Sequence, residues 1–308
     1  MLPRLPAALA ALLALFLIPQ TALACACGCS VFSVGAGSIL PTDHGGDAWV
    51  EYDHMDQSRN WSGARPAPAA DNDDKRITSQ FVDLGAQYMF TCGWGVMVEV
   101  PVTSRTFRTD VGGGTIDSFH AQALGDIRLT AVYTGLTKAM TTGLTFGLKL
   151  PTGDYHAAGF DRDTQIGSGS TDVILGAYHV GALNRDETLT YFVKGAWQVP
   201  VITVGGYRPG QTFDAATGLI YKAASYRNDD VSISPLLQLV ASMRGSDAGV
   251  AADSLNSGYS RLLVSPGVEV RAYSWRLYGD VKFPIYQQVR GNQLVAPAFV
   301  SVALSRSF

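Results

Sequence analysis

The chain has 308 residues, of which 47% are hydrophobic and only 16% are charged, and its formal net charge is −3. Soluble globular proteins carry about 25% charged residues, so the apolar side chains need a location other than an ordinary soluble core. This hydrophobic content excludes disorder for most of the chain. The slightly acidic balance excludes a nucleic-acid-binding protein and a polybasic membrane tag.

The N-terminus has the pattern of a secretory signal peptide. Arg4 precedes an apolar stretch over residues 5–19, and Ala22-Leu23-Ala24 fits the small-x-small cleavage pattern, although Ala24-Cys25-Ala26 fits it as well. The predicted organisation is a cleaved signal peptide at 1–24, a cysteine-containing periplasmic or lumen-entering segment at 25–45, and a single barrel domain at 46–308.

Three cysteines, Cys25, Cys27 and Cys29, stand at every second position after the signal peptide, and Cys92 lies alone in a predicted periplasmic turn. In extended backbone the three side chains share one face. An exported protein with four cysteines favours disulfides, and a bridge from Cys92 to the triad would tether the N-terminal segment. Two alternatives stay open: a soft metal ion bound by the cluster, or an acyl chain on Cys25.

Segments of about ten residues with strand periodicity follow along the chain. Apolar and polar residues alternate over residues 94–103, 144–150, 231–243, 262–272 and 277–285, and again over 300–308 up to the terminal Phe308. No stretch after residue 24 has the 18 or more apolar residues of a membrane helix. Pro235 and Pro266 fall on apolar faces, where a strand accepts proline only with a local bulge.

Long and short connections alternate between these segments. The long polar ones lie near residues 58–76, 109–120, 153–170, 202–215 and 245–258, and the short ones near 91–93, 136–141, 182–187, 228–230 and 274. Long extracellular loops and short periplasmic turns are typical of outer-membrane barrels. We therefore predict an all-β fold, an antiparallel transmembrane β-barrel of about twelve strands; a soluble β-sandwich is the alternative, but its exposed faces would carry more charge.

If the apolar parity faces lipid, the opposite parity lines the lumen. Its charged members are predicted pore-lining residues: Glu99, Asp126, Arg128, Lys149, Lys194, Lys222, Arg244, Glu269, Arg271, Arg276, Asp280 and Lys282. Eight are basic and four acidic, and a basic lumen favours anionic or polar neutral solutes. The alternative is a closed barrel in which these charges pair with one another.

Other chemistry has weaker support. Asp161, Asp163, Gln165 and Asp172 resemble the first positions of a calcium loop, but Ile166 stands where that loop needs glycine. The five histidines are scattered, and no nucleophile elbow or carboxylate pair is present in the sequence. The sequence therefore predicts no catalytic residue and no enzyme.

The motif Leu150-Pro151-Thr152-Gly153-Asp154-Tyr155, followed one loop later by Gly167-Ser168-Gly169-Ser170-Thr171-Asp172, resembles the signature of the outer-membrane channel family named for the MetA pathway of phenol degradation. That family is related to the channel that secretes functional amyloid. The resemblance implies a porin-like barrel of twelve strands and transport, with aromatic compounds among the solutes of some members.

The sequence therefore predicts an outer-membrane channel of a Gram-negative bacterium for passive uptake of small solutes. Expected partners are outer-membrane lipid, lipopolysaccharide, the barrel-assembly machinery and the solute, with no nucleic acid and no cofactor apart from a metal ion at the cysteine cluster; an oligomer is compatible with the sequence. A metal-handling envelope protein and a structural barrel without transport are the alternatives.

Mass spectrometry of the purified mature protein tests the cysteine predictions. Disulfides lower the mass by the hydrogens lost from each thiol pair, and a metal ion or an acyl chain on Cys25 raises it. A mass equal to that of the fully reduced, unmodified chain would contradict all three alternatives.

Overall fold

The computed structural model describes residues 45–90, 93–226 and 230–308. The predicted signal peptide, Cys25, Cys27, Cys29 and Cys92 lie outside the described residues, so the disulfide, metal and lipid alternatives stay predictions. No helix within the described residues is long and apolar enough to cross a membrane.

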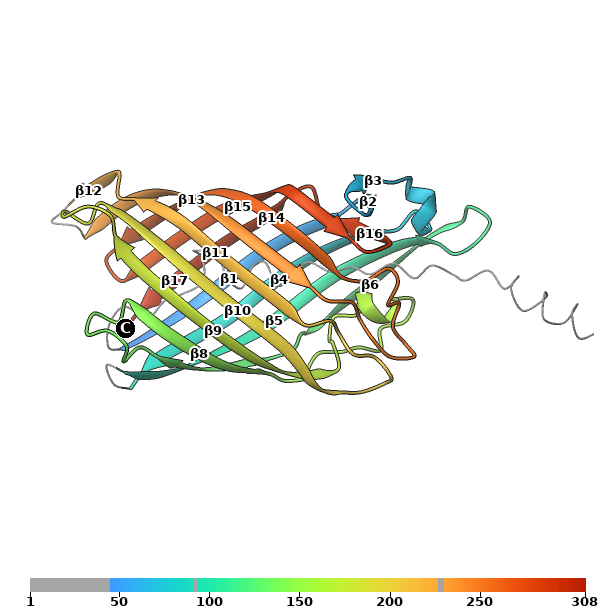
Figure 1. The fold of residues 1–308 in the computed structure, drawn as a ribbon, viewed down its shortest axis with the longest axis horizontal. Coiled ribbons are helices and arrows are strands. Elements are labelled where there is room, and N and C mark those ends of the chain that lie inside the picture. The colour runs from blue at the N-terminus through green and yellow to red at the C-terminus, as the bar shows by residue number, and fades with distance from the viewer. Residues whose placement is uncertain (1–44, 91–92, 227–229) are drawn as a thin grey trace, which may run out of the picture.

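One large antiparallel sheet closes on itself (Figure 1). Its strands are β1 (Gly45–Gln57), β4 (Arg76–Met89), β5 (Trp94–Asp110), β6 (Ile116–Leu124), β7 (Arg128–Tyr133), β8 (Thr142–Lys149), β9 (Ser170–Ala182), β10 (Leu189–Thr203), β11 (Thr212–Tyr221), β12 (Ala224–Tyr226), β13 (Val231–Arg244), β14 (Tyr259–Ala272), β15 (Trp275–Val289) and β17 (Phe299–Ser307). Pairing of β1 with β17 and of β11 with β13 completes the ring.

The ring contains twelve strand positions, as predicted. Strands β6 and β7 both pair with β5 and form one position interrupted at residues 125–127, and β11 and β12 both pair with β13 and form another. The second interruption lies opposite Pro235, where the pairing shifts from Leu236 with Ile220 to Ile233 with Ala224. This irregularity agrees with the bulge expected at a proline within a sheet.

The connections separate into two ends of the barrel (Figure 1). The C-terminus and the short turns, such as 273–274 and 183–188, lie at one end, and the long loops lie at the other. Two predicted details are corrected. The connection near 109–120 is shorter than predicted, because β5 continues to Asp110 and β6 begins at Ile116; and the loop at 290–298, which the sequence did not reveal, carries β16 (Asn292–Val295).

A second, small sheet lies at the end with the long loops. It consists of β16, β2 (Arg59–Ser62) and β3 (Arg65–Pro66), next to the short 3-10 helix η3 (Ala69–Asn72). Side-chain amides join it to the barrel: Gln57 Nε2 donates to the Leu294 carbonyl at 3.1 Å, and Gln293 Nε2 donates to the Gly258 carbonyl at 2.8 Å.

The outer face of the strands is apolar. On β13, Ile233, Leu237 and Leu239 are exposed while Ser234 and Gln238 between them are buried, which confirms the predicted parity. Exposed aromatic residues gather near the short turns, among them Trp94, whose ring lies tilted against that of Tyr133 with the centres 4.8 Å apart, and Trp275, beside Arg306. An apolar band bordered by aromatic residues is typical of a barrel in a lipid bilayer.

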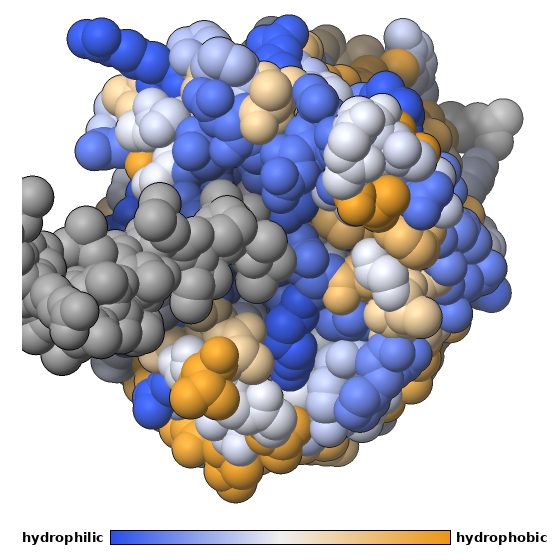
Figure 2. Space-filling view, turned by 90° about the vertical axis from the view of Figure 1, so that its right-hand side faces the viewer, coloured by the Kyte–Doolittle hydropathy of each residue, from blue (hydrophilic) through white to orange (hydrophobic). Residues whose placement is uncertain are grey.

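Figure 2 shows the end that carries the long loops. Hydrophilic residues run through its centre and apolar residues gather towards its periphery. This distribution is the reverse of a soluble protein, in which the apolar residues occupy the interior.

The substitution Leu237→Arg tests the lipid-facing assignment. Leu237 is 54% exposed near the middle of β13, and an arginine on the lipid face near the bilayer midplane costs about 2–4 kcal/mol. Denaturant titration of the barrel in lipid vesicles should show this loss. The control Val250→Arg, at a position 99% exposed in a loop, should change stability little; equal effects of the two substitutions would contradict the assignment.

Candidate functional site: the barrel lumen

Part of the barrel interior is filled by a buried polar network on β13, β14, β15 and β17. Gln238 Nε2 donates to Tyr278 Oη and to Asp280 Oδ2, both at 2.9 Å. Lys282 Nζ donates to Asp280 Oδ1 at 3.0 Å and to Ser301 Oγ at 2.7 Å. All of these side chains are at most 4% exposed. The predicted pore-lining residues Asp280 and Lys282 therefore pair within the wall.

A second group of ion pairs lies near the short-turn end. Arg271 Nε and Arg276 Nε donate to the two carboxylate oxygens of Glu269, at 2.5 and 2.6 Å. These three predicted pore-lining residues neutralise one another in part, and none of them lines the cavity described next. Lys222 also lies outside it, at the interruption between β11 and β12.

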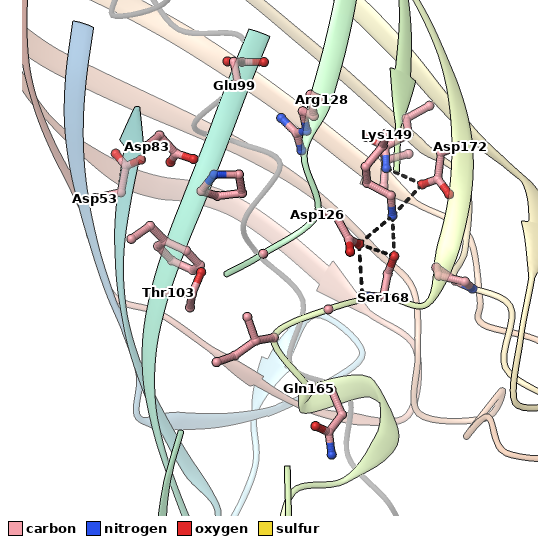
Figure 3. A pocket seen from close by; sticks show the side chains of 18 of the residues that line it. Asp53, Asp83, Glu99, Thr103, Asp126, Arg128, Lys149, Gln165, Ser168 and Asp172 are labelled. Carbon is pink, nitrogen blue, oxygen red and sulfur yellow. Dashed lines mark hydrogen bonds and ion pairs between the residues drawn. The ribbon is translucent and has the colours of Figure 1, made fainter. Parts of the chain in front are cut away.

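The remaining interior encloses a cavity of about 270 Å³ (Figure 3). Its wall includes Glu51, Asp53, Asp83 and Glu99 on β1, β4 and β5, and Arg128, Lys149, Asp172 and Lys194 on β7 to β10. Apolar side chains of Trp49, Phe81 and Met97 complete the lining next to the carboxylates. Six predicted pore-lining residues do face this cavity: Glu99, Asp126, Arg128, Lys149, Lys194 and Arg244.

A loop formed by residues 150–169, here called the inward loop, also lines this cavity. Lys149, immediately before it, is 6% exposed. Its Nζ atom lies 2.9 Å from Asp172 Oδ2 and 3.4 Å from Asp126 Oδ2, and it donates to Ser168 Oγ at 2.6 Å. Figure 3 shows these four side chains converging. Lys149 therefore ties both ends of the inward loop to the wall.

The Pro-Thr-Gly-Asp and Gly-Ser-Gly-Ser motifs have a structural role in this arrangement. Asp126, in the interruption between β6 and β7, accepts hydrogen bonds from the backbone amides of Gly153 and Ser168, both at 3.0 Å. The Thr152 hydroxyl accepts from the Ile127 amide at 2.9 Å. A Cβ atom on Gly167 would overlap the Gly153 backbone, so both ends of the loop approach closely only because glycine stands there.

Two arginines hold the far part of the inward loop, which contains the short 3-10 helix η4 (Arg162–Thr164). Arg105 donates to the Thr164 carbonyl at 2.6 Å and to Ser79 Oγ at 2.9 Å. The Arg162 guanidinium lies 4.4 Å from the ring centre of Tyr207 and 4.8 Å from that of Tyr155. These contacts of the two arginines hold the far part of the inward loop in place.

Asp163 in η4 titrates unusually. Burial, together with the negative charges of Asp161 and Asp247, raises the pKa of this loop carboxyl to about 7. Folding therefore favours the protonated form of Asp163. The contribution of this protonated carboxyl to the stability of the fold is complete below pH 3.8, its ordinary pKa, and is lost as the pH rises through about 7.

The predicted excess of basic residues is absent from the described residues that line the cavity. Seven carboxylates (Glu51, Asp53, Asp83, Glu99, Asp126, Asp163 and Asp172) face six cations (Arg105, Arg128, Lys149, Arg162, Lys194 and Arg244). The predicted pore-lining set lacked Glu51, Asp53 and Asp83, and it lacked Asp163 and Asp172, which the sequence suggested only as positions of a calcium loop. The alternation of Glu51 and Asp53 with Val50 and Tyr52 carries the same parity signal as the strands that were identified. The anion preference inferred from that excess loses its basis.

Within the described residues, no three His, Cys, Asp or Glu side chains are placed to hold a metal ion. The lumen therefore offers charge and hydrogen-bonding capacity without a metal centre among these residues.

Two solved structures show the same fold. An outer membrane channel from Pseudomonas putida F1 superposes with a TM-score of 0.66 at 15% identity, covering 89% of this chain and 98% of that chain. The β-domain of the Bordetella autotransporter BrkA superposes with a TM-score of 0.52 at 9% identity, covering 86% and 100% respectively. No family model and no curated protein matches the sequence.

The chain thus has the fold of an outer-membrane β-barrel. The resemblance to porin-like outer-membrane channels is confirmed at the level of the fold, since a solved channel of that membrane is among the structural neighbours.

The substitution Lys149→Met tests the role of Lys149 as the anchor of the inward loop. It leaves Asp126 and Asp172 buried without their cation, and removing one partner of a buried pair costs about 3–5 kcal/mol. We expect a lower denaturation midpoint and new tryptic cleavage after Arg162, measured on the folded barrel in detergent.

The matched control is Lys138→Met, at an exposed lysine in a short turn, which should leave both measurements unchanged. If Lys149→Met behaves like this control, the inward loop does not depend on the pairing.

Proposed function

We propose that this protein is a passive outer-membrane channel for small solutes, exported through its N-terminal signal peptide, and that it is not an enzyme. The observation that carries the proposal is a cavity of about 270 Å³ inside a closed barrel whose outer face is apolar. Such a barrel places the cavity across the bilayer, where its function is to pass or hold a solute.

The size of the cavity limits the solute. Pockets for drug-sized ligands occupy about 300–1,000 Å³, so the cavity suits a molecule with few non-hydrogen atoms. The apolar rings of Trp49 and Phe81 beside the carboxylates accept a solute that is partly hydrophobic. The solved Pseudomonas protein is a channel, and we infer the same role for this chain.

The inward loop sets the width of the passage in this proposal. Its residues Gln165, Ile166 and Gly167 line the cavity, and Lys149, Asp126 and Arg105 hold it there. A solute that crosses the barrel must pass this loop, so weakening its attachment should widen the passage.

Planar-bilayer recordings of the purified full-length protein test the proposal. We expect discrete single-channel currents from the wild-type protein, and larger currents from Lys149→Met because the inward loop is released from the wall. Lys138→Met should conduct like the wild type. Absence of current from every form, together with no swelling of liposomes in small sugars or amino acids, would overturn the channel function in favour of a structural barrel.

A further inference from the structure

The far part of the inward loop, residues 154–166, lies against two other long connections of the barrel. Tyr207, in the connection between β10 and β11, packs its ring against the Arg162 guanidinium. The Tyr207 hydroxyl donates a hydrogen bond at 2.7 Å to Asp247, in the connection between β13 and β14. Asp163 lines the cavity at this junction of three loops and feels the charge of Asp247. A carboxylate that joins two loops therefore acts on a carboxyl of the third.

The carboxyl of Asp163 lacks the contacts that an ionised group needs. Its Oδ2 atom is buried and has no hydrogen-bond partner among the described residues. Burial raises the pKa of this carboxyl to about 7, and the negative charges of Asp161 and Asp247 act in the same direction. The backbone amide of Asp163 and the ammonium of Lys75 act in the opposite direction, but their effect is smaller. The attached loop therefore accommodates the neutral carboxyl and disfavours the ionised one.

Two cations packed near Asp163 are bound to other carboxylates. Lys75, directly before β4, lies 3.0 Å from Asp161 Oδ2. Arg244 on β13 lies 2.6 Å from Asp247 Oδ1. Each of these cations stabilises the carboxylate that it contacts, so both negative charges beside Asp163 stay in place when the pH changes around neutrality.

The other charged and titratable groups at the junction bind elsewhere too. Arg105 on β5 and Arg162 donate to backbone carbonyls of the inward loop, at 2.6 and 2.7 Å. Tyr207 donates its hydroxyl proton to Asp247. The contacts of these three side chains hold the loop in either charge state of Asp163, and ionisation of that carboxyl opposes them.

We propose that the inward loop is a pH-sensitive gate, in which ionisation of Asp163 releases residues 154–166 from the loop junction and widens the passage. The proton passes to bulk water, and the carboxylate gains water only when the loop moves, because its Oδ2 atom is buried in the attached position. Lys149 and Asp126 still hold the two ends of the loop, so the movement is confined to its far part. This inference rests on the channel function, because it states when the channel conducts more.

The direction of the response follows from the two positions of Asp163. Its pKa is about 7 in the attached loop, and the exposed carboxyl of the released loop has the ordinary value of 3.8. Release therefore gives up a proton at pH values between these two, and the released population rises with pH until about 7 and levels off above it. From pH 6 to pH 8 the equilibrium constant for release should rise about tenfold.

Hydrogen exchange with mass spectrometry on the detergent-solubilised full chain measures the release directly. The matched variant is Asp163→Asn, whose amide keeps the size of the carboxyl and cannot ionise. Comparison at equal pH removes the intrinsic pH dependence of amide exchange. Relative to this variant, the wild type should exchange about tenfold faster over residues 154–166 at pH 8 than at pH 6.

The control His156→Gln replaces an exposed histidine of the same loop, 3.8 Å from Asp154. Histidine is the side chain that ordinarily changes charge near neutral pH, so this variant tests the competing source of a pH response. It should respond to pH like the wild type. Equal exchange in the wild type and Asp163→Asn at both pH values, or loss of the response in His156→Gln, would overturn the inference.

Single-channel recordings at pH 6 and pH 8 connect the release to conduction. In the wild type, the ratio of time in a larger-conductance state to time in a smaller one should rise about tenfold between these pH values. Asp163→Asn should keep its pH 6 behaviour at pH 8, and His156→Gln should follow the wild type.

The two measurements separate this inference from the channel function. If no form conducts but exchange in the wild type responds to pH through Asp163, the channel function fails and the pH-dependent release of the loop stands. If the channel conducts and neither exchange nor conductance responds to pH, the gate fails and the channel function stands.

Discussion

The need to hydrogen-bond every backbone group that faces lipid determines the rest of this structure. A sheet in a bilayer cannot leave an open edge, because no water is present to replace the missing partner. The ladder between β11 and β13 closes the ring, and the ladder between β1 and β17 joins the first strand to the last. Closure then fixes which side chains face outward and which share the confined interior.

Confinement explains why so many polar groups inside the barrel are paired. The interior of a twelve-stranded barrel lies between filled small barrels and open porins. One part is filled by the network of Gln238, Asp280 and Lys282, whose members satisfy one another. The other part contains the cavity and the inward loop. The lumen is therefore closed by side chains in one part and open in the other.

Two sets of charges in the lumen are compensated by different partners. Lys149 lies within ion-pairing distance of both Asp126 and Asp172, and these pairs hold the inward loop. Asp53 is also buried, and Lys282 and Ser301 lie near enough to compensate its charge. Charges of both kinds stay inside the barrel because a partner offsets the cost of burying them.

The sequence by itself determined the class of fold, because alternation with period two is a local property that each strand carries alone. The apolar parity of residues 231–243 and the alternation of long and short connections were sufficient to predict a barrel of about twelve strands. They also identified Glu99, Asp126, Arg128, Lys149 and Lys194 as lumen residues, and the structure places all five at the cavity.

Only the tertiary structure decided which of these charges are neutralised and where space remains. Lys149 pairs with Asp126 on one side and Asp172 on the other, and Lys282 lies beside Asp280 and Ser301. These distances depend on strand register, on the interruption at residues 125–127 and on the inward path of the loop. A one-dimensional pattern contains parity, but it contains neither the register between distant strands nor the path of a loop.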